Sequence, residues 1–154
     1  MRDILGFWIG ESESAKMWLN VFNDIKSRGV EDVLIFCSDN LKGISEAITL
    51  TYPKIKIQKC IVHQIRNSTK YVRYYHLKEF TSDMKKIYTP ANLDLALESL
   101  DNFSNKWNDL YGYAVKSWEN NMDELTTFFE FPVELRKLIY TTNIIESFNR
   151  KIRK

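Results

Sequence analysis

The sequence predicts an α/β fold in which strands and helices alternate at the start and helices follow. Over residues 1–59, short apolar runs alternate with segments of helical periodicity. This order is typical of sheets whose parallel strands are joined by right-handed crossovers. Residues 62–131 show helical periodicity and no convincing strand. The length of 154 residues fits one domain, or one domain with a substantial insertion.

The first predicted elements are a strand and a helix. Residues 3–9 form a compact apolar run that predicts a strand. Ser12 or Ser14 then caps a helix, and Gly29 ends it. The apolar face of this helix has the 3, 4 spacing of Ala15, Trp18, Leu19, Phe22 and Ile25.

Two further strands complete the predicted sheet. Residues 33–37 are a short uninterrupted apolar run, typical of a buried parallel strand. A short helix closed by Pro53 follows, and residues 54–59 then alternate like an edge strand with lysines outward. Asp39 stands just after the second strand, where ligand groups of open α/β sheets lie. The alternative is that Asp39 forms a turn or caps the next helix.

The rest of the chain predicts a helical block of about four segments and a final helix. Breaks are expected at Thr89-Pro90 and near Tyr111-Gly112. Pro132 stands near the first position of the final helix, which runs from residue 133 to 153.

Composition excludes several classes of protein. The net charge is only +2, so the chain as a whole is not a polycation. A nucleic-acid site therefore requires local clustering of cations. Cys37 and Cys60 are the two cysteines, which is too few for a disulfide framework or a four-cysteine zinc site. No apolar run approaches the roughly 18–20 residues of a membrane span, and the first ten residues do not resemble a secretory signal. We therefore expect a cytoplasmic protein.

Glu146 is the single carboxylate of the basic C-terminal stretch TTNIIESFNRKIRK. A divalent cation takes oxygen ligands, and neighbouring cations can hold the phosphates on which the ion acts. On a helix, one polar face would carry Asn143, Glu146, Asn149, Arg150 and Arg153. The alternative is a solvated helix end with an intrahelical Glu146–Arg150 pair worth about 0.3–0.5 kcal/mol.

A second polar face is predicted after the third strand. Its members are two cations, an amide and an imidazole: His63, Arg66, Asn67 and Lys70. Such a stripe suits contacts to phosphates, and the alternative is a solvated helix face.

Two other features have competing interpretations. Cys60 and His63 look like half a zinc site, but only Cys37 and His76 remain as further ligands, so structural zinc is not favoured. Trp118 could stack on an unpaired base. The alternative is that Trp118 belongs to the core, as a tryptophan at core spacing usually does.

Four segments together resemble the Mutator-type transposases of bacterial insertion sequences: LGFWIGESES, SDNLKGI, CIVHQIRN and YTTNIIESFNR. The resemblance covers essentially the whole chain, and the last two segments are its most specific motifs. It implies an RNase H-like core with a helical insertion ahead of the last catalytic helix. The implied organisation is a partial core at residues 1–74, a helical insertion at 75–131, and a C-terminal helix completing the core at 132–154.

The resemblance also assigns roles. Asp39 matches the second aspartate of an Asp-Asp-Glu metal triad and Glu146 matches its glutamate. Cys60 and His63 match a Cys-x-x-His signature that shapes the site and contacts DNA rather than binding zinc. The implied DNA-binding residues are His63, Arg66, Asn67, Lys70, Asn149, Arg150 and Arg153. Two Mg²⁺ ions about 3.5–4 Å apart would activate water or a 3′-hydroxyl and stabilise the leaving oxygen, at the ends of the element and at target DNA.

The resemblance further implies that parts are missing. The first aspartate of the triad would lie upstream, and Asp3 does not replace it because Asp3 begins the segment that matches the third strand. The first two strands of the core have no match either. We therefore expect a nucleoid-associated fragment of a DNA transposase, inactive alone, that self-associates or assembles with intact transposase. The alternatives are a non-enzymatic remnant that binds DNA or assembles, and a degraded product without function.

Overall fold

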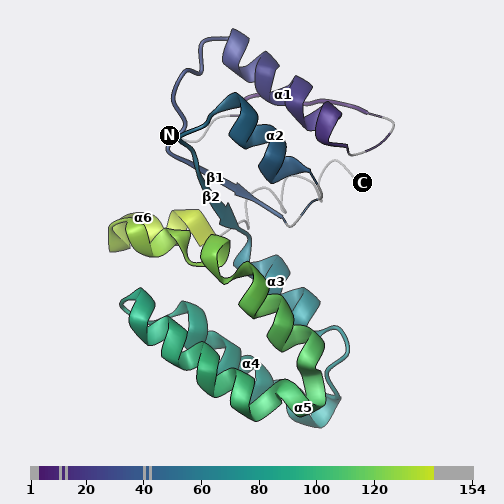
Figure 1. Ribbon diagram of the computed structural model, residues 1–154, viewed down its shortest axis with the longest axis vertical. Helices are drawn as coiled ribbons and strands as arrows, with labels where there is room; N and C mark the ends of the chain where they lie inside the picture. Colours follow the sequence, from purple (N-terminus) through teal and green to yellow (C-terminus); the bar gives the residue numbers. More distant parts are fainter. Residues whose placement is uncertain (1–3, 11, 13, 40, 42, 141–154) are drawn as a thin grey trace. The chain divides into compact units, whose positions relative to one another are not determined.

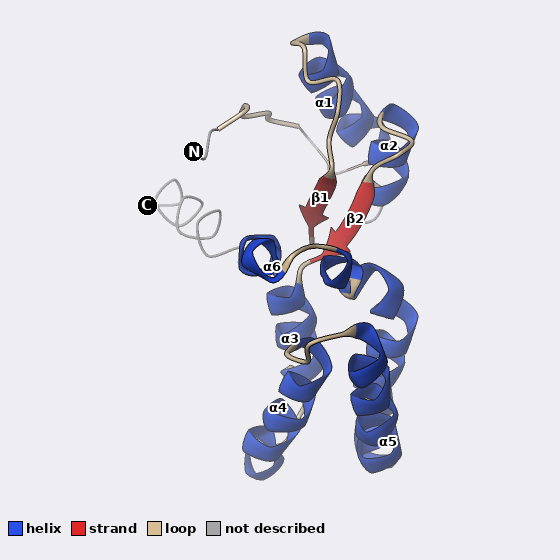
Figure 2. Ribbon diagram, turned by 90° about the vertical axis from the view of Figure 1, so that its left-hand side faces the viewer, coloured by secondary structure: helices blue, strands red, loops and turns tan. Residues whose placement is uncertain are grey.

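The computed structural model describes residues 4–140 apart from residues 11, 13, 40 and 42 (Figure 1). The described residues form an α/β structure that is mostly helical. Its parallel sheet has two strands, β1 (Ile35–Ser38) and β2 (Lys56–Lys59) (Figure 2). The chain divides into two compact units, residues 1–57 and 58–154. The predicted α/β class is therefore confirmed, and the three-part domain organisation stays a prediction.

In the first unit, α1 (Ala15–Ser27) has the ends that the sequence predicts. The hydroxyl of Ser14 accepts a hydrogen bond from the Met17 amide at 3.2 Å, which satisfies one of the free donors of the first turn. At the other end the Gly29 amide donates to the Lys26 carbonyl at 3.0 Å. Gly29 has a φ of +97°, a left-handed conformation that glycine adopts without steric cost.

The core of the first unit lies between α1 and α2 (Ile44–Thr51), which pack against each other (Figure 1). Phe22 connects α1 to the sheet, because its ring meets the Phe36 ring of β1 edge-on at 5.2 Å. The buried cluster consists of Val21, Phe22, Ile44, Ala47, Ile48 and Tyr52. Each large apolar side chain buried here contributes about 1.5–3 kcal/mol, so packing holds the helix pair together.

The strand predicted at residues 3–9 is wrong for its described part, because residues 4–9 form neither helix nor strand. This segment is held to α1 by side chains instead of by a strand ladder. The Trp8 indole nitrogen donates to the Asp24 carboxylate at 3.2 Å, and the Arg28 guanidinium lies 5.4 Å from the Trp8 ring. Arg28 also donates to the Leu5 carbonyl at 2.6 Å. The apolar run therefore marks a segment that packs on a helix through one tryptophan.

The second unit is helical after β2. Its elements are α3 (Ile61–Thr69), α4 (Tyr74–Tyr88), α5 (Leu93–Leu125), the 3₁₀ helix η1 (Thr127–Glu130) and α6 (Val133–Tyr140). The predicted break at Thr89-Pro90 is confirmed by the end of α4. None of the helices in the described part of the chain is long and apolar enough to cross a membrane.

The helix α5 reverses its direction at Tyr111, as the predicted break near that residue requires. The backbone of Tyr111 is non-helical, with φ −135° and ψ 45°. Ser104 and Glu119, on either side of it, are joined by a hydrogen bond of 3.0 Å between hydroxyl and carboxylate. In a straight helix, residues 15 apart would be separated by about 22 Å. The two halves of α5 therefore fold back on each other (Figure 1).

The core of the second unit begins with α4 lying against the first half of α5. Phe80 is 0% exposed, and its ring lies 5.1–5.4 Å from three rings of α5. These rings belong to Phe103, Trp107 and Tyr111. Tilted and edge-on arrangements of this kind add about 0.5–1.5 kcal/mol per pair beyond the burial of area.

A buried amide joins β2 to the far end of α5. The Gln58 side chain is 0% exposed, and its nitrogen donates to the carbonyls of Lys59 and Leu125, both at 2.8 Å. Its oxygen accepts from the Phe128 amide at 2.8 Å. Both donors and the oxygen of this amide are thus bonded. Gln58 fixes the end of β2 to the end of α5 and to η1.

An ion network joins α4 to the first half of α5. The Asp83 carboxylate accepts from Lys106 at 2.6 Å, from Trp107 at 3.1 Å and from Lys86 at 2.9 Å. Burial of Asp83 by itself raises the pKa of this carboxyl, but the hydrogen bonds from these three residues outweigh it. The net effect is to lower the pKa of Asp83 below its ordinary value.

This network makes stability depend on pH. Because the folded state lowers the pKa of Asp83, its contribution is complete above the unfolded pKa of about 3.9 and is lost as pH falls through the folded pKa. We expect the free energy of unfolding of Asp83→Asn, measured with urea, to decline less steeply below about pH 4 than that of the unchanged chain. Asp101→Asn, at an exposed position of α5, is the control. Parallel pH curves for the unchanged chain and Asp83→Asn would contradict this account.

Candidate functional site

Asp39 directly follows β1 and is half-buried. Its backbone carbonyl accepts from the Leu41 amide at 2.8 Å and from the Ser38 hydroxyl at 3.0 Å, so the backbone turns here as expected. The N-cap residue of α2 is Gly43, with φ +81°, and not Asp39. A Cβ at Gly43 would come within 2.8 Å of the Ala15 Cβ, which explains the glycine. The helix-cap alternative for Asp39 is therefore not the observed arrangement.

Cys60 and His63 lie on the first turn of α3 and contact each other. Cys60 is the N-cap residue and is 4% exposed, and its Sγ lies 3.2 Å from His63 Nδ1. The thiol donates to Nδ1 in one imidazole tautomer, and Nδ1–H donates to sulfur in the other. This contact holds the imidazole at the start of the helix.

His76, the other histidine, does not join Cys60 and His63 in a zinc site. His76 lies on α4, and its Nδ1 is 2.7 Å from the hydroxyl oxygen of Tyr111. Its ring also packs edge-on against Trp107 at 5.5 Å. His76 is thus part of the contact between α4 and α5.

The polar stripe predicted on α3 lies on the outside of the second unit. We call His63, Arg66, Asn67 and Lys70 the α3 stripe. His63 is half-buried and the other three are exposed. The opposite side of α3 is buried through Ile61, Gln64 and Ser68. The stripe therefore lies on the exposed side of α3.

The contacts behind the stripe are polar and specific. Gln64 donates to the Ser117 hydroxyl at 2.9 Å, and the Tyr113 hydroxyl donates to the Ser68 carbonyl at 2.8 Å. Both partners belong to the second half of α5. Because these groups lose bonds if α3 rotates, they determine which residues of α3 face outward.

The C-terminal candidates lie outside the described residues. They are Glu146, Asn149, Arg150 and Arg153. The predicted polar face of the final helix and the predicted approach of Glu146 to Asp39 therefore stay predictions.

Of the two interpretations of Trp118, the structure supports the core and not base stacking. Stacking requires an exposed ring, and Trp118 is 1% exposed. Its ring is stacked on Tyr88 of α4, with centroids 6.4 Å apart and planes 9° apart. Trp118 belongs to the core, because the reversal of α5 brings its ring against Tyr88 of α4.

The sequence interpretation missed a group of exposed tyrosines between α3 and α4. Tyr71 is 66% exposed, Tyr74 91% and Tyr75 65%. The signal in the sequence is the run KYVRYY, which contains three tyrosines and two cations within six residues.

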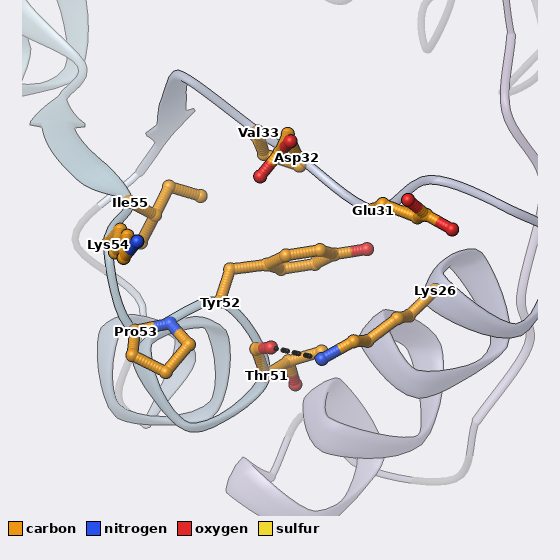
Figure 3. Close-up of a pocket in the computed structure, with 9 residues that line it drawn as sticks. All are labelled: Lys26, Glu31, Asp32, Val33, Thr51, Tyr52, Pro53, Lys54 and Ile55. Atoms are coloured by element: carbon orange, nitrogen blue, oxygen red, sulfur yellow. Dashed lines mark hydrogen bonds between the residues drawn. The ribbon is translucent and has the colours of Figure 1, made fainter.

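A hollow of about 230 Å³ in the first unit lies beside the Tyr52 ring (Figure 3). Lys26 donates to the Thr51 carbonyl at 3.0 Å and lies 5.5 Å from the Tyr52 ring. The charged side chains that line the hollow are two lysines and two carboxylates: Lys26, Lys54, Glu31 and Asp32. Because these charges balance, the hollow does not favour phosphate and is not part of the candidate site.

Known proteins match this chain over its whole length. The family described as "Transposase, Mutator family" matches residues 1–154. A probable transposase for insertion sequence element ISRM3-like from Sinorhizobium fredii is 41% identical over 154 residues, which are 99% of this chain and 38% of that protein. The transposase for ISRM3 from Rhizobium meliloti is 40% identical over the same shares.

A third relative comes from another bacterium. A probable insertion-sequence transposase from Corynebacterium diphtheriae is 39% identical, over 100% of this chain and 45% of that protein. The chain thus spans 38–45% of the length of these relatives. The match over residues 1–154 shows that the chain belongs to the Mutator family of transposases.

Proposed function

We propose that this chain is part of the catalytic domain of a DNA transposase, which moves an insertion sequence by metal-dependent cleavage and joining of phosphodiester bonds. The observation that carries the proposal is the family match over residues 1–154. In this proposal the chain contributes to an RNase H-like core with a helical insertion. Its DNA partners are the ends of the element and the target.

Asp39 and Glu146 are the proposed ligands of Mg²⁺. Asp39 supports this role because it is half-buried and follows β1 directly, at the end of a strand where ligand groups of α/β sheets lie. Its carboxylate oxygens are the ligand type that Mg²⁺ prefers. When bound, the metal would activate the attacking oxygen and stabilise the leaving oxygen. The first aspartate of the triad has no match in these residues, so we propose that another part of the transposase supplies it.

The α3 stripe is the proposed contact to the DNA backbone. Arg66 and Lys70 are exposed cations on one side of the helix, and Asn67 between them can donate to phosphate oxygens. Cys60 orients His63 at the start of the stripe through the 3.2 Å contact. These residues position DNA and carry no sequence preference by themselves, because phosphates are the same at every base pair.

The catalytic proposal is tested in a transposase that contains this segment. Asp39→Asn and Glu146→Gln each keep the size of the side chain and remove its charge. We expect either change to reduce Mg²⁺-dependent strand transfer to background while DNA binding is retained, whereas Asp101→Asn keeps activity. The 154-residue chain alone should show no transfer, because one carboxylate of the metal site is absent.

Two results would contradict the catalytic proposal. One is transfer by the whole transposase that survives both substitutions. The other is transfer by the 154-residue chain that disappears on Glu146→Gln, since an acid within these residues would then replace the missing aspartate. DNA binding without any transfer by the whole transposase would favour a non-enzymatic DNA-binding remnant.

The DNA-binding proposal predicts a specific dependence on salt. Each phosphate contact that is lost should reduce the slope of log affinity against log salt by about 0.9 on duplex DNA. We expect Arg66→Ala and Lys70→Ala each to do this in fluorescence anisotropy titrations of the chain. Lys116→Ala removes an exposed lysine from α5 and should leave the slope unchanged. If the α3 variants behave like Lys116→Ala, the stripe is merely solvated.

A further inference from the structure

The connection between α3 and α4 exposes more aromatic surface than folding requires. Tyr74 is the first residue of α4 and is 91% exposed, and Tyr75 beside it is 65% exposed. Burying an aromatic ring of this kind is favourable, and Tyr and Trp supply much of the contact energy where proteins bind ligands. Adjacent exposed rings that form a patch differ from the scattered apolar residues of an ordinary surface.

These two tyrosines line an open hollow of about 670 Å³ between α3 and α4. Ile65 of α3 and Leu77 of α4 contribute apolar lining. Lys78 is the only charged residue among those that line it. The volume lies within the usual range of small-ligand sites, about 300–1,000 Å³. The volume of the hollow, its two tyrosine rings and the positive charge of Lys78 therefore suit a planar group attached to an anion.

The segment of the chain that carries the tyrosines is positively charged. Residues 70–78 contain three cations and no carboxylate. The cations are Lys70, Arg73 and Lys78. Arg73 donates to the Tyr75 hydroxyl at 2.7 Å, which ties a cation to one of the rings. The next residue, Glu79, is held by Lys106 at 2.6 Å. This charge is complementary to phosphodiester groups.

The hollow also adjoins the α3 stripe. Ile65 and Thr69 of α3 line the hollow, and the residues that follow them in the chain, Arg66 and Lys70, belong to the stripe. Lys70 belongs to the stripe and begins the cationic run. A DNA strand that follows the stripe would therefore reach the tyrosines.

We propose that Tyr74 and Tyr75 form a stacking surface for an unpaired base of DNA, with Lys70, Arg73 and Lys78 holding the flanking phosphates. Such surfaces accept any base, because every base has a π-face. The inference rests on the proposed function, since it requires DNA along α3. It assigns to these tyrosines the role that the buried Trp118 cannot fill.

The test measures binding of the 154-residue chain to a fluorescein-labelled single strand of thymidines and to a blunt duplex of equal length. We expect Tyr74→Ala with Tyr75→Ala to weaken single-strand binding about fivefold or more, and duplex binding by less than about twofold. Tyr74→Phe with Tyr75→Phe keeps the rings and should bind the single strand like the unchanged chain. Leu97→Ala, which removes an apolar side chain that is 42% exposed on α5, is the matched control.

Several results would overturn the inference. One is single-strand binding that the alanine variant leaves unchanged, and another is a loss in the phenylalanine variant as large as in the alanine variant. Equal losses on single strand and duplex would indicate backbone contact instead of stacking. Duplex binding without single-strand binding would also refute the stacking surface but leave the proposed function standing. Binding to neither DNA would contradict the DNA contact of the proposed function as well. Circular dichroism of each variant confirms that the fold is kept.

Discussion

The polar contacts between α3 and the second half of α5 are the constraint on which the candidate DNA-binding surface depends. Gln64 and Ser68 face α5, where Ser117 and Tyr113 complete their hydrogen bonds. Rotating α3 by one residue would turn it by about 100° and leave these buried groups without partners, at a cost of about 1–3 kcal/mol each. An apolar interface would tolerate such rotation more easily. The α3 stripe therefore faces outward because the opposite face of the helix can bond only in this orientation.

The reversal of α5 at Tyr111 makes this arrangement possible. It places the first half of the helix against α4 and brings the second half into contact with both α3 and α4. Tyr111 is buried and its hydroxyl accepts from the Arg73 amide at 3.2 Å, so the turning point also fixes the start of α4. Gln58 then joins the end of the returning half to β2. The helices α3 and α4 are thus positioned by α5, and the exposed tyrosines lie near the point where α3 and α4 meet.

Local signals in the sequence predicted the local features well. The Ser14 cap and the Gly29 end of α1 need only their neighbours, and the break at Tyr111 follows from the change in apolar periodicity. Two features of the structure did not follow from the local sequence, because they depend on residues that are distant in the chain. Residues 4–9 look like a strand, but Trp8 packs on α1. Gln58 falls on the polar face of an alternating strand, yet it is 0% exposed because α5 and η1 cover that face.

The candidate site shows the same division. Cys60 and His63 are three residues apart, a spacing that places them on one turn of a helix and allows the observed contact. The outward direction of Arg66 and Lys70 followed from helical periodicity. Trp118 could not be assigned from its spacing, because its burial depends on the reversal of α5 and on the stacked Tyr88 ring. The exposure of the tyrosines was missed because an aromatic residue in a sequence is normally taken as core.

We expect DNA to bind this chain through α3. The most direct measurement is a ¹⁵N–¹H correlation spectrum of the chain, recorded with and without a short duplex at low salt. The account predicts that the amide signals of Arg66, Asn67 and Lys70 shift, while those of Lys116 and Asn120 on the exposed face of α5 stay in place. Shifts centred on α5, with the α3 signals unchanged, would contradict it.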